Sequence, residues 1–155
     1  MRFKEIYAKE FEARTLELGL TQEEVVNLAS IIEKETGRAE ERPLIASVFK
    51  NRLKKGIPLA SDPTIIYGIK DFSGNLTRKD LAKPGPYNSY LNLGLPPTPI
   101  ANPGRDSIRA VLYPAETDFL YFVSKNDGNH HFSKTEAEHM AAVRKYQSSQ
   151  PATKP

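Results

Sequence analysis

Apolar residues recur every three to four positions in three segments of the first third of the chain, which is the spacing of an amphipathic helix. The first segment covers about residues 3–18. The second begins at Thr21, the first residue of a capping box, and ends before Gly37. The third begins with Glu41, Arg42 and Pro43 and stops at Gly56. We therefore expect three consecutive helices.

Three shorter helices are expected in the middle of the chain, with starts at Asp62, Thr77 and Asp106. Between the last two lies a segment without helix or strand periodicity, residues 83–104, which contains six prolines. A loop of this length inside a compact domain is usually functional or disordered. Its tyrosines, leucines and isoleucine argue against disorder.

The last part of the chain changes from helical to alternating spacing. The runs FLYFVSK and HHFSK are joined by NDGN, which predicts an antiparallel β-hairpin. A final helix is expected from Thr135, which forms a capping box with Glu138, to about Gln147. Residues 148–155 are expected to be a flexible tail. The pattern predicts a mostly helical α+β fold with a small antiparallel sheet.

Composition narrows the class of protein. The 155 residues are 39% hydrophobic and 26% charged, as in an ordinary globular domain. The absence of cysteine excludes disulfides and thiolate metal sites. No window is long and apolar enough for a membrane helix or a signal peptide, so we expect this chain itself to be soluble. The net charge of +3 suits an anionic partner, although a solvated mixed surface is the simpler explanation of this charge.

Two glutamates near the end of the second expected helix are candidates for acid catalysis. On a helical wheel, Val25, Leu28 and Ile32 belong to the buried stripe, and Glu33 and Glu35 fall on its opposite flanks. Partial desolvation at such a boundary raises a carboxyl pKa toward the range of a general acid. Periodicity alone leaves the choice between them open, and either one also fits a surface ion pair.

The proline-rich loop contains groups that sugar-binding sites use. The YNSY motif places an amide between two aromatic rings, and GLPPTPIANPG is a rigid strip that suits the wall of a groove. Aromatic rings stack on the apolar face of a sugar, and amides bind its N-acetyl and hydroxyl groups. Local packing of the loop explains the same residues without a ligand.

Seven motifs occur in a distinctive order: ASIIEKE, ASVFKNRL, DPTIIYG, YNSY, GLPP, PIANPG and YFVSKNDGNHHFS. This set, from about Thr21 to Tyr146, resembles the catalytic domain of the YceG-like (MltG) endolytic murein transglycosylases. The resemblance implies a lysozyme-like catalytic domain over residues 1–147, with a leading helix in 1–20 and the family core in 21–147. The resemblance also implies that Glu33 is the catalytic acid, a choice that the helical wheel leaves open.

The resemblance implies a lyase that cleaves the β-1,4 bond between N-acetylmuramic acid and N-acetylglucosamine within peptidoglycan strands. The product is a 1,6-anhydromuramic end, and cleavage would terminate elongation of a nascent strand. A single carboxylate serves as acid and then as base, so no cofactor and no metal are expected.

Substrate-binding roles are expected for residues of the matching motifs. Asp62 either orients Glu33 or caps its helix, and Asn88 is expected to contact an N-acetyl group or Glu33. The expected substrate-binding residues are Asp62, Thr64, Tyr67, Tyr87, Asn88, Tyr90, Leu95, Pro96 and Asn102.

Other classes of function remain as alternatives. A helix-turn-helix is disfavoured because the helix after GLTQEEVVNLA continues where that motif needs a turn, so no nucleic acid partner is expected. His130 and His131 are adjacent on an expected strand and point to opposite faces, which disfavours a shared metal. A non-catalytic peptidoglycan-binding module would not need Glu33. A hydrolytic muramidase would need a second carboxylate, for which Asp62 is the candidate.

The resemblance also implies a location. Family members are anchored in the cell inner (cytoplasmic) membrane and face the periplasm or cell wall, with a LysM-like region upstream. We expect this chain to be the catalytic part of such a protein, without the anchor. Its expected partners are peptidoglycan strands and, as a second class, peptidoglycan synthases.

Overall fold

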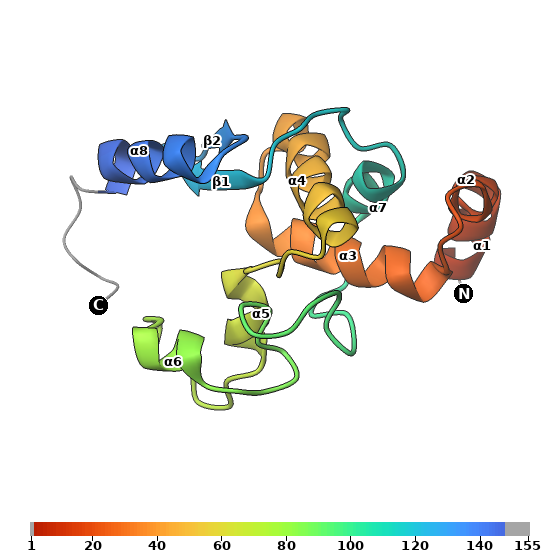
Figure 1. Cartoon of the computed structure of the whole chain (residues 1–155). Helices are drawn as coiled ribbons and strands as arrows, with labels where there is room; N and C mark the ends of the chain where they lie inside the picture. Colours follow the sequence, from red (N-terminus) through yellow and green to blue (C-terminus); the bar gives the residue numbers. More distant parts are fainter. Residues whose placement is uncertain (1, 148–155) are drawn as a thin grey trace.

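A computed structural model describes residues 2–147 of the chain, and Figure 1 shows the arrangement of its elements. The described part is mostly helical with one two-stranded antiparallel sheet, which confirms the expected fold class. In chain order the elements are α1 (Arg2–Glu10), α2 (Glu12–Glu17), α3 (Gln22–Glu35), the 3-10 turn η1 (Ala39–Glu41), α4 (Arg42–Lys55), α5 (Asp62–Tyr67), α6 (Arg78–Ala82), α7 (Arg105–Leu112), β1 (Tyr121–Ser124), β2 (His130–Ser133) and α8 (Glu136–Gln147).

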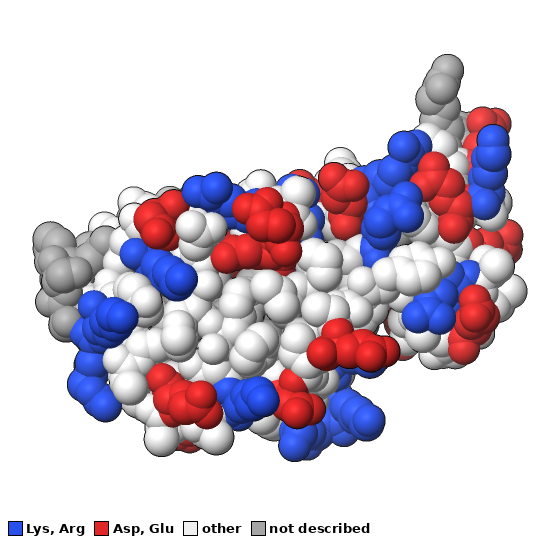
Figure 2. All heavy atoms as spheres, turned by 90° about the horizontal axis from the view of Figure 1, so that it is seen from above, with Lys and Arg blue, Asp and Glu red and all other residues white. Residues whose placement is uncertain are grey.

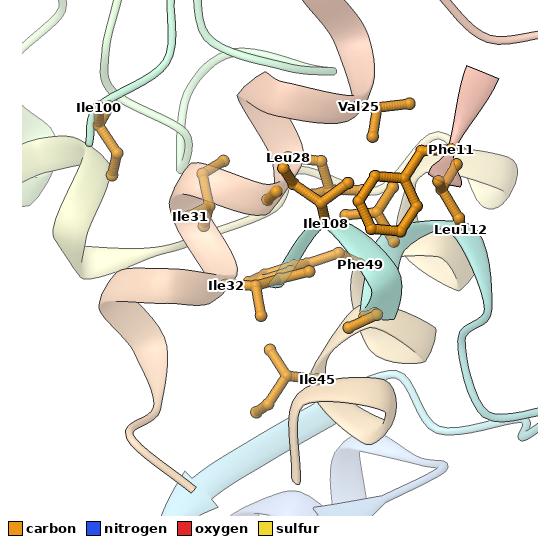
Figure 3. Packing of buried hydrophobic residues seen from close by; sticks show 14 of the residues in the cluster. Phe11, Val25, Leu28, Ile31, Ile32, Ile45, Phe49, Ile100, Ile108 and Leu112 are labelled. Atoms are coloured by element: carbon orange, nitrogen blue, oxygen red, sulfur yellow. The ribbon is translucent and has the colours of Figure 1, made fainter. Parts of the chain in front are cut away.

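Helix α3 lies at the centre of the hydrophobic core. The predicted stripe of α3 is buried, and it packs against α7 and α4. Figure 3 shows Ile32 of α3 close to Ile45 and Phe49 of α4, while Ile108 of α7 lies near Leu28. The capping box of Thr21 and Glu24 starts α3 as expected, with both hydrogen bonds present. The central helix is therefore held firmly, and it fixes the positions of the two glutamates at its end.

The leading segment is two helices, so the expectation of one helix over residues 3–18 is wrong. The chain turns at Phe11, between α1 and α2, and the Phe11 ring is buried in the core. This turn also brings the Tyr7 hydroxyl within 2.7 Å of Thr15 Oγ1. Burial of an aromatic ring and closure of a buried hydrogen bond outweigh the continued backbone ladder of one straight helix.

Strands β1 and β2 form the expected hairpin, with Phe122 opposite Phe132 and Ser124 opposite His130. The NDGN turn contains Gly128 at a φ of +89°, a backbone conformation that glycine adopts without strain. The hairpin and α8 pack together at one end of the molecule, opposite α1 and α2 (Figure 1). The expected tail at 148–155 lies outside the described residues.

The surface carries both signs of charge. On the face shown in Figure 2, basic and acidic side chains alternate around a broad uncharged area, with no single-sign stripe of the kind that nucleic-acid-binding proteins use. Within residues 2–147, every helix is too short or too polar to cross a membrane.

Candidate active site

A cavity of about 710 Å³ lies between the helical core and the unit formed by the hairpin and α8. Its walls come from the end of α3, from α4, from the start of α5 and its preceding loop, and from the C-terminal unit. This volume is in the range of pockets that hold small ligands or sugar units. The polar side chains on its walls are Glu35, Arg52, Asp62, Tyr90, Tyr121, Ser124, Asn126, His130, His139 and Gln147.

Glu35 is the last residue of α3 and is half-buried on the cavity wall. Its Oε2 accepts a hydrogen bond of 2.7 Å from the Ser61 hydroxyl. The helix ends here because Thr36 takes an extended conformation. The end of the central helix thus presents one carboxylate to the cavity.

Asp62 and Tyr90 lie on the same cavity wall. The Tyr90 hydroxyl donates a hydrogen bond of 2.6 Å to Asp62 Oδ1. Burial, followed by the bond to Asp62, raises the pKa of Tyr90 well above its ordinary value, so this phenol keeps its proton and remains a donor. Ser61 occupies the N-cap position of α5 and Asp62 is its first helical residue, so Asp62 does not act as the N-cap.

The cavity lining also contains a cation, Arg52, and a neutral imidazole, His139. Arg52 donates from Nε to the Leu120 carbonyl and from Nη1 to the Pro58 carbonyl, both at 2.7 Å, so the guanidinium is held in place. Burial lowers the pKa of Arg52, but a guanidinium remains charged at any physiological pH. Burial also lowers the pKa of His139, whose ring stacks on Tyr121 with centroids 4.8 Å apart.

Glu33 lies outside this cavity, on the other flank of α3. Its Oε1 accepts hydrogen bonds from the Gly104 amide at 2.9 Å and from the Ser107 hydroxyl at 2.8 Å. Gly104 is the N-cap residue of α7, so the Glu33 carboxylate sits at the positive end of that helix.

The Gly104 amide lowers the pKa of Glu33 the most, and burial opposes it only in part. The expectation of a raised pKa at Glu33 is therefore wrong. The physical reason is that hydrogen bonds from the Gly104 amide and the Ser107 hydroxyl stabilise the carboxylate anion more than partial burial destabilises it.

Thr64 of the DPT motif is buried beneath the residues that line the cavity. Thr64 is fully buried, and its hydroxyl donates to the Ser61 carbonyl at 2.8 Å and lies 2.7 Å from Ser89 Oγ. Thr64 therefore supports Ser61 and does not line the cavity. Its expected contact with a substrate stays a prediction that this geometry does not favour.

Asn88 is only 4% exposed, and its amide is used inside the loop. Nδ2 donates to the carbonyls of Leu81 and Lys83, and Oδ1 accepts from the amides of Tyr90 and Leu91. These four bonds use the full capacity of the side chain. The alternative that Asn88 contacts Glu33 is wrong, and the residue instead fixes the loop segment that carries Tyr90.

The remaining expected binding residues lie away from the cavity lining. Tyr67 is 50% exposed, and its ring centroid lies 5.0 Å from that of Tyr87, whose hydroxyl bonds to Thr98. Leu95 packs against the core, the Pro96 carbonyl accepts a bond from Asn27, and Asn102 is exposed. The loop is ordered by these contacts, and the binding roles of its residues stay predictions.

The hairpin wall also depends on Glu41, the last residue of η1. Glu41 is buried, accepts from the His130 amide at 2.8 Å, and its other oxygen lies 2.7 Å from His130 Nδ1. Arg38 also donates to the Asp127 carbonyl in the hairpin turn. Both contacts join η1 and its N-cap to the hairpin. Within residues 2–147, no three acidic or histidine side chains are grouped as a metal site.

Known proteins resemble this chain over most of its length. The YceG-like family model matches residues 1–145. An endolytic murein transglycosylase of Bacillus subtilis is 42% identical over 143 residues, which are 92% of this chain and 40% of that protein. The enzyme of the same name from Streptococcus pneumoniae is 36% identical over 126 residues, 77% of this chain and 23% of that protein.

A crystal structure of a YceG-like protein from Listeria monocytogenes has the same fold, with a TM-score of 0.82 and 38% identity. The match covers 90% of this chain and 45% of that one, so the chain spans less than half the length of these relatives. Because the family model matches residues 1–145 and the Bacillus subtilis relative is 42% identical over 92% of the chain, the chain belongs to the YceG-like family.

Proposed function

We propose that this chain is the catalytic part of an endolytic peptidoglycan lytic transglycosylase. Two relatives that carry this name match most of the chain. The observation that carries the proposal is a sugar-sized cavity with a half-buried carboxylate, Glu35, held in place by Ser61. The substrate is the glycan strand of peptidoglycan.

We assign the catalytic acid to Glu35 in place of Glu33. A general acid must reach the bond that it protonates. Glu35 lies on the cavity wall, whereas the Glu33 carboxylate is held at the start of α7 by Gly104 and Ser107. The Gly104 amide, together with the Ser107 hydroxyl, also lowers the pKa of Glu33, so these contacts favour its charged form.

The reaction needs only one carboxylate that acts twice. Protonated Glu35 donates its proton to the oxygen between N-acetylmuramic acid and N-acetylglucosamine, and the bond from that oxygen to the muramic C1 breaks. The N-acetyl group of the muramic residue supports the positive charge that develops on C1. The Glu35 carboxylate then takes the proton of the muramic C6 hydroxyl as that oxygen bonds to C1. A 1,6-anhydro end forms, the acid is regenerated, and no water is consumed.

The geometry also supports roles for the neighbouring groups. Arg52 supplies a fixed positive charge on the wall that includes Tyr121, and Tyr90 holds the Asp62 carboxylate with its hydroxyl. Neutral Tyr90 and His139 are available as hydrogen-bond partners for sugar hydroxyls. The cavity excludes part of the solvent, which protects the intermediate from water.

A hydrolytic muramidase is the second candidate, because Asp62 lies on the same wall as Glu35. In that enzyme a second carboxylate acts as nucleophile or activates a water. The hydrogen bond from the Tyr90 hydroxyl holds the Asp62 carboxylate in place, which suits either role.

Digestion of purified glycan strands, followed by mass analysis of the products, tests the proposal. We expect anhydro ends, which are lighter than reducing ends by one water. Reducing ends alone would show a muramidase, and binding without cleavage would show a peptidoglycan-binding module. Cleavage within long strands, and not from their ends, is expected for an endolytic enzyme and is read from the early product lengths.

The cellular setting remains a proposal as well. The curated relatives are longer than this chain, and we propose that the full protein is anchored in the inner membrane with this part facing the cell wall. In that position it would terminate the growth of nascent strands, with peptidoglycan synthases as partners. Cross-linking in cells, followed by identification of the captured proteins, tests the synthase partnership.

A further inference from the structure

The turn before α5 contains a residue in an unfavourable backbone conformation. Ala60 has a φ of +53°, in the left-handed region. The other non-glycine residue with positive φ in the described part of the chain is Asn126, a residue type that tolerates this region. Alanine gains nothing locally from such a φ, and strain of this kind persists only where the surroundings enforce it. Ala60 lies on the cavity wall, two residues before Asp62.

Ser89, from the YNSY motif, is the residue that enforces this turn. Its carbonyl accepts from the Ala60 amide at 3.0 Å, and its Oγ accepts from the Ser61 amide at 2.8 Å. Thr64 completes the arrangement through its bonds to Ser89 Oγ and to the Ser61 carbonyl. Ser89, Ser61 and Thr64 are at most 4% exposed, so water does not compete for these bonds.

The turn places one hydroxyl against the proposed catalytic carboxylate. Ser61 follows the strained residue directly, and its Oγ donates to Glu35 Oε2 at 2.7 Å. We propose that Ser89 is a positioning residue for the reaction: by fixing the Ala60–Ser61 turn, it holds the Ser61 hydroxyl against Glu35. This inference rests on the proposed function, because it assumes that Glu35 is the acid.

Such a contact matters for a carboxyl group that must give and take a proton within one cycle. The Ser61 hydroxyl stabilises the anion that forms after the first step, and it also fixes the orientation of the carboxyl plane. A fixed carboxyl plane presents the proton to the substrate in one orientation. The strain at Ala60 is thus explained as part of the machinery that orients the acid.

The test compares kcat and KM on glycan strands for four variants. We expect Ser61→Ala and Ser89→Ala each to lower kcat by roughly 10- to 100-fold, with KM changed by less than about twofold. Ser89→Thr retains the hydroxyl and is expected to restore most of the activity. The double variant of Ser61→Ala with Ser89→Ala is expected to resemble Ser61→Ala alone, because both residues act through one contact.

The pH dependence of kcat supplies a readout that a purely structural role would not move. Loss of the Ser61 hydroxyl removes a donor to the anion, so the alkaline limb of the profile is expected to move up by roughly 1 pH unit. The parent and the variants share the other titratable groups on this cavity, which are Arg52, Asp62, Tyr90, Tyr121, His130 and His139. The shift is therefore read as the difference between parent and variant.

Ser47→Ala is the matched control. Ser47 is a buried serine like Ser61 and Ser89, and its hydroxyl donates to the Leu44 carbonyl, but it does not line the cavity. We expect it to leave kcat and the profile unchanged. The proposal is overturned if Ser89→Ala retains kcat, if its kcat falls only with the folded fraction, or if the two losses multiply in the double variant.

Failure of the proposed function gives a different result. If Glu35→Gln retains cleavage, the assignment of the acid is wrong whatever the serine variants do. If Glu35→Gln is inactive but Ser61→Ala retains both kcat and the parent profile, the acid is correct and only the positioning role fails.

Discussion

The two flanks of α3 use the same residue type for different purposes. On one flank, Glu33 meets the start of α7, where an amide and a hydroxyl bind its carboxylate. On the other flank, Glu35 meets a cavity in which Ser61, Asp62, Tyr90 and Arg52 are also found. One carboxylate joins two helices, and the other faces space that a ligand can enter.

The difference between the flanks shows how surroundings assign a role to a carboxyl group. At a helix N-terminus the anion is stabilised, so a proton is held weakly and the group serves as structure. In a cavity that a substrate can enter, the same group can exchange a proton with that substrate. The two residues are separated by a single position, and the direction of each side chain decides its surroundings.

The largest expected effect is on the rate of cleavage when each of the two glutamates is replaced. The sequence resemblance implies that Glu33 is the acid, and we expect the loss of activity at Glu35. Glu35→Gln is expected to lower the rate of strand cleavage by about 10³-fold or more, because it removes the proton donor. Glu33→Gln is expected to keep the rate within about threefold of the parent, since its contacts lie outside the cavity. Both variants are compared by cleavage rate, with circular dichroism as the check on folding. An inactive Glu33→Gln beside an active Glu35→Gln would reverse the assignment.

Much of the fold was predictable because its signals are local. The capping boxes at Thr21 and Thr77, the stop at Gly56 and the NDGN turn each depend on residues within a few positions of one another. The buried stripe of α3 followed from periodicity. The break at Phe11 was missed, because it depends on a core that distant helices build.

The candidate site was less predictable because its contacts join distant segments. The bonds from Glu35 to Ser61 and from Asp62 to Tyr90 span 26 and 28 positions, and no local pattern encodes them. Asn88 had the residue type of a sugar contact, yet its amide serves the loop backbone. The helical wheel did place Glu33 and Glu35 on opposite flanks, and only the packing of α7 distinguished the two.

A second prediction concerns the hairpin, which forms part of the cavity wall on the Glu35 side of α3. Glu41→Ala removes the partner of the His130 amide and ring, and leaves buried donors unpaired. We expect a loss of about 2 kcal/mol in the free energy of unfolding, together with reduced cleavage, because the hairpin wall loosens. Urea unfolding and cleavage assays measure the two effects. The neighbouring exposed Glu40→Ala is the control and should change neither.

Replacement of Glu33, on the opposite flank of α3, is expected to lower stability and leave activity intact. Glu33→Ala removes the acceptor for the Gly104 amide and the Ser107 hydroxyl. We expect a loss of about 1 kcal/mol in the free energy of unfolding, the usual effect of deleting a side chain that caps a helix. Cleavage by the remaining folded protein should match the parent. A large loss of cleavage with unchanged stability would contradict the separation of the two flanks.

The smallest expected effect is the pH dependence of the free energy of unfolding that Glu33 contributes. The folded protein lowers the pKa of Glu33 below its ordinary value of 4.5, so unfolding takes up a proton in the acid range. The stabilisation from the charged form is fully present above pH 4.5 and is lost as the pH falls through the folded-state pKa. We therefore expect the gap in unfolding free energy between the parent and Glu33→Gln to narrow below pH 4.5. Urea titrations of both proteins from neutral to acid pH measure this gap. A gap that stays constant into acid would mean that Glu33 contributes through neutral hydrogen bonds, and that the helix N-terminus does not select its anion.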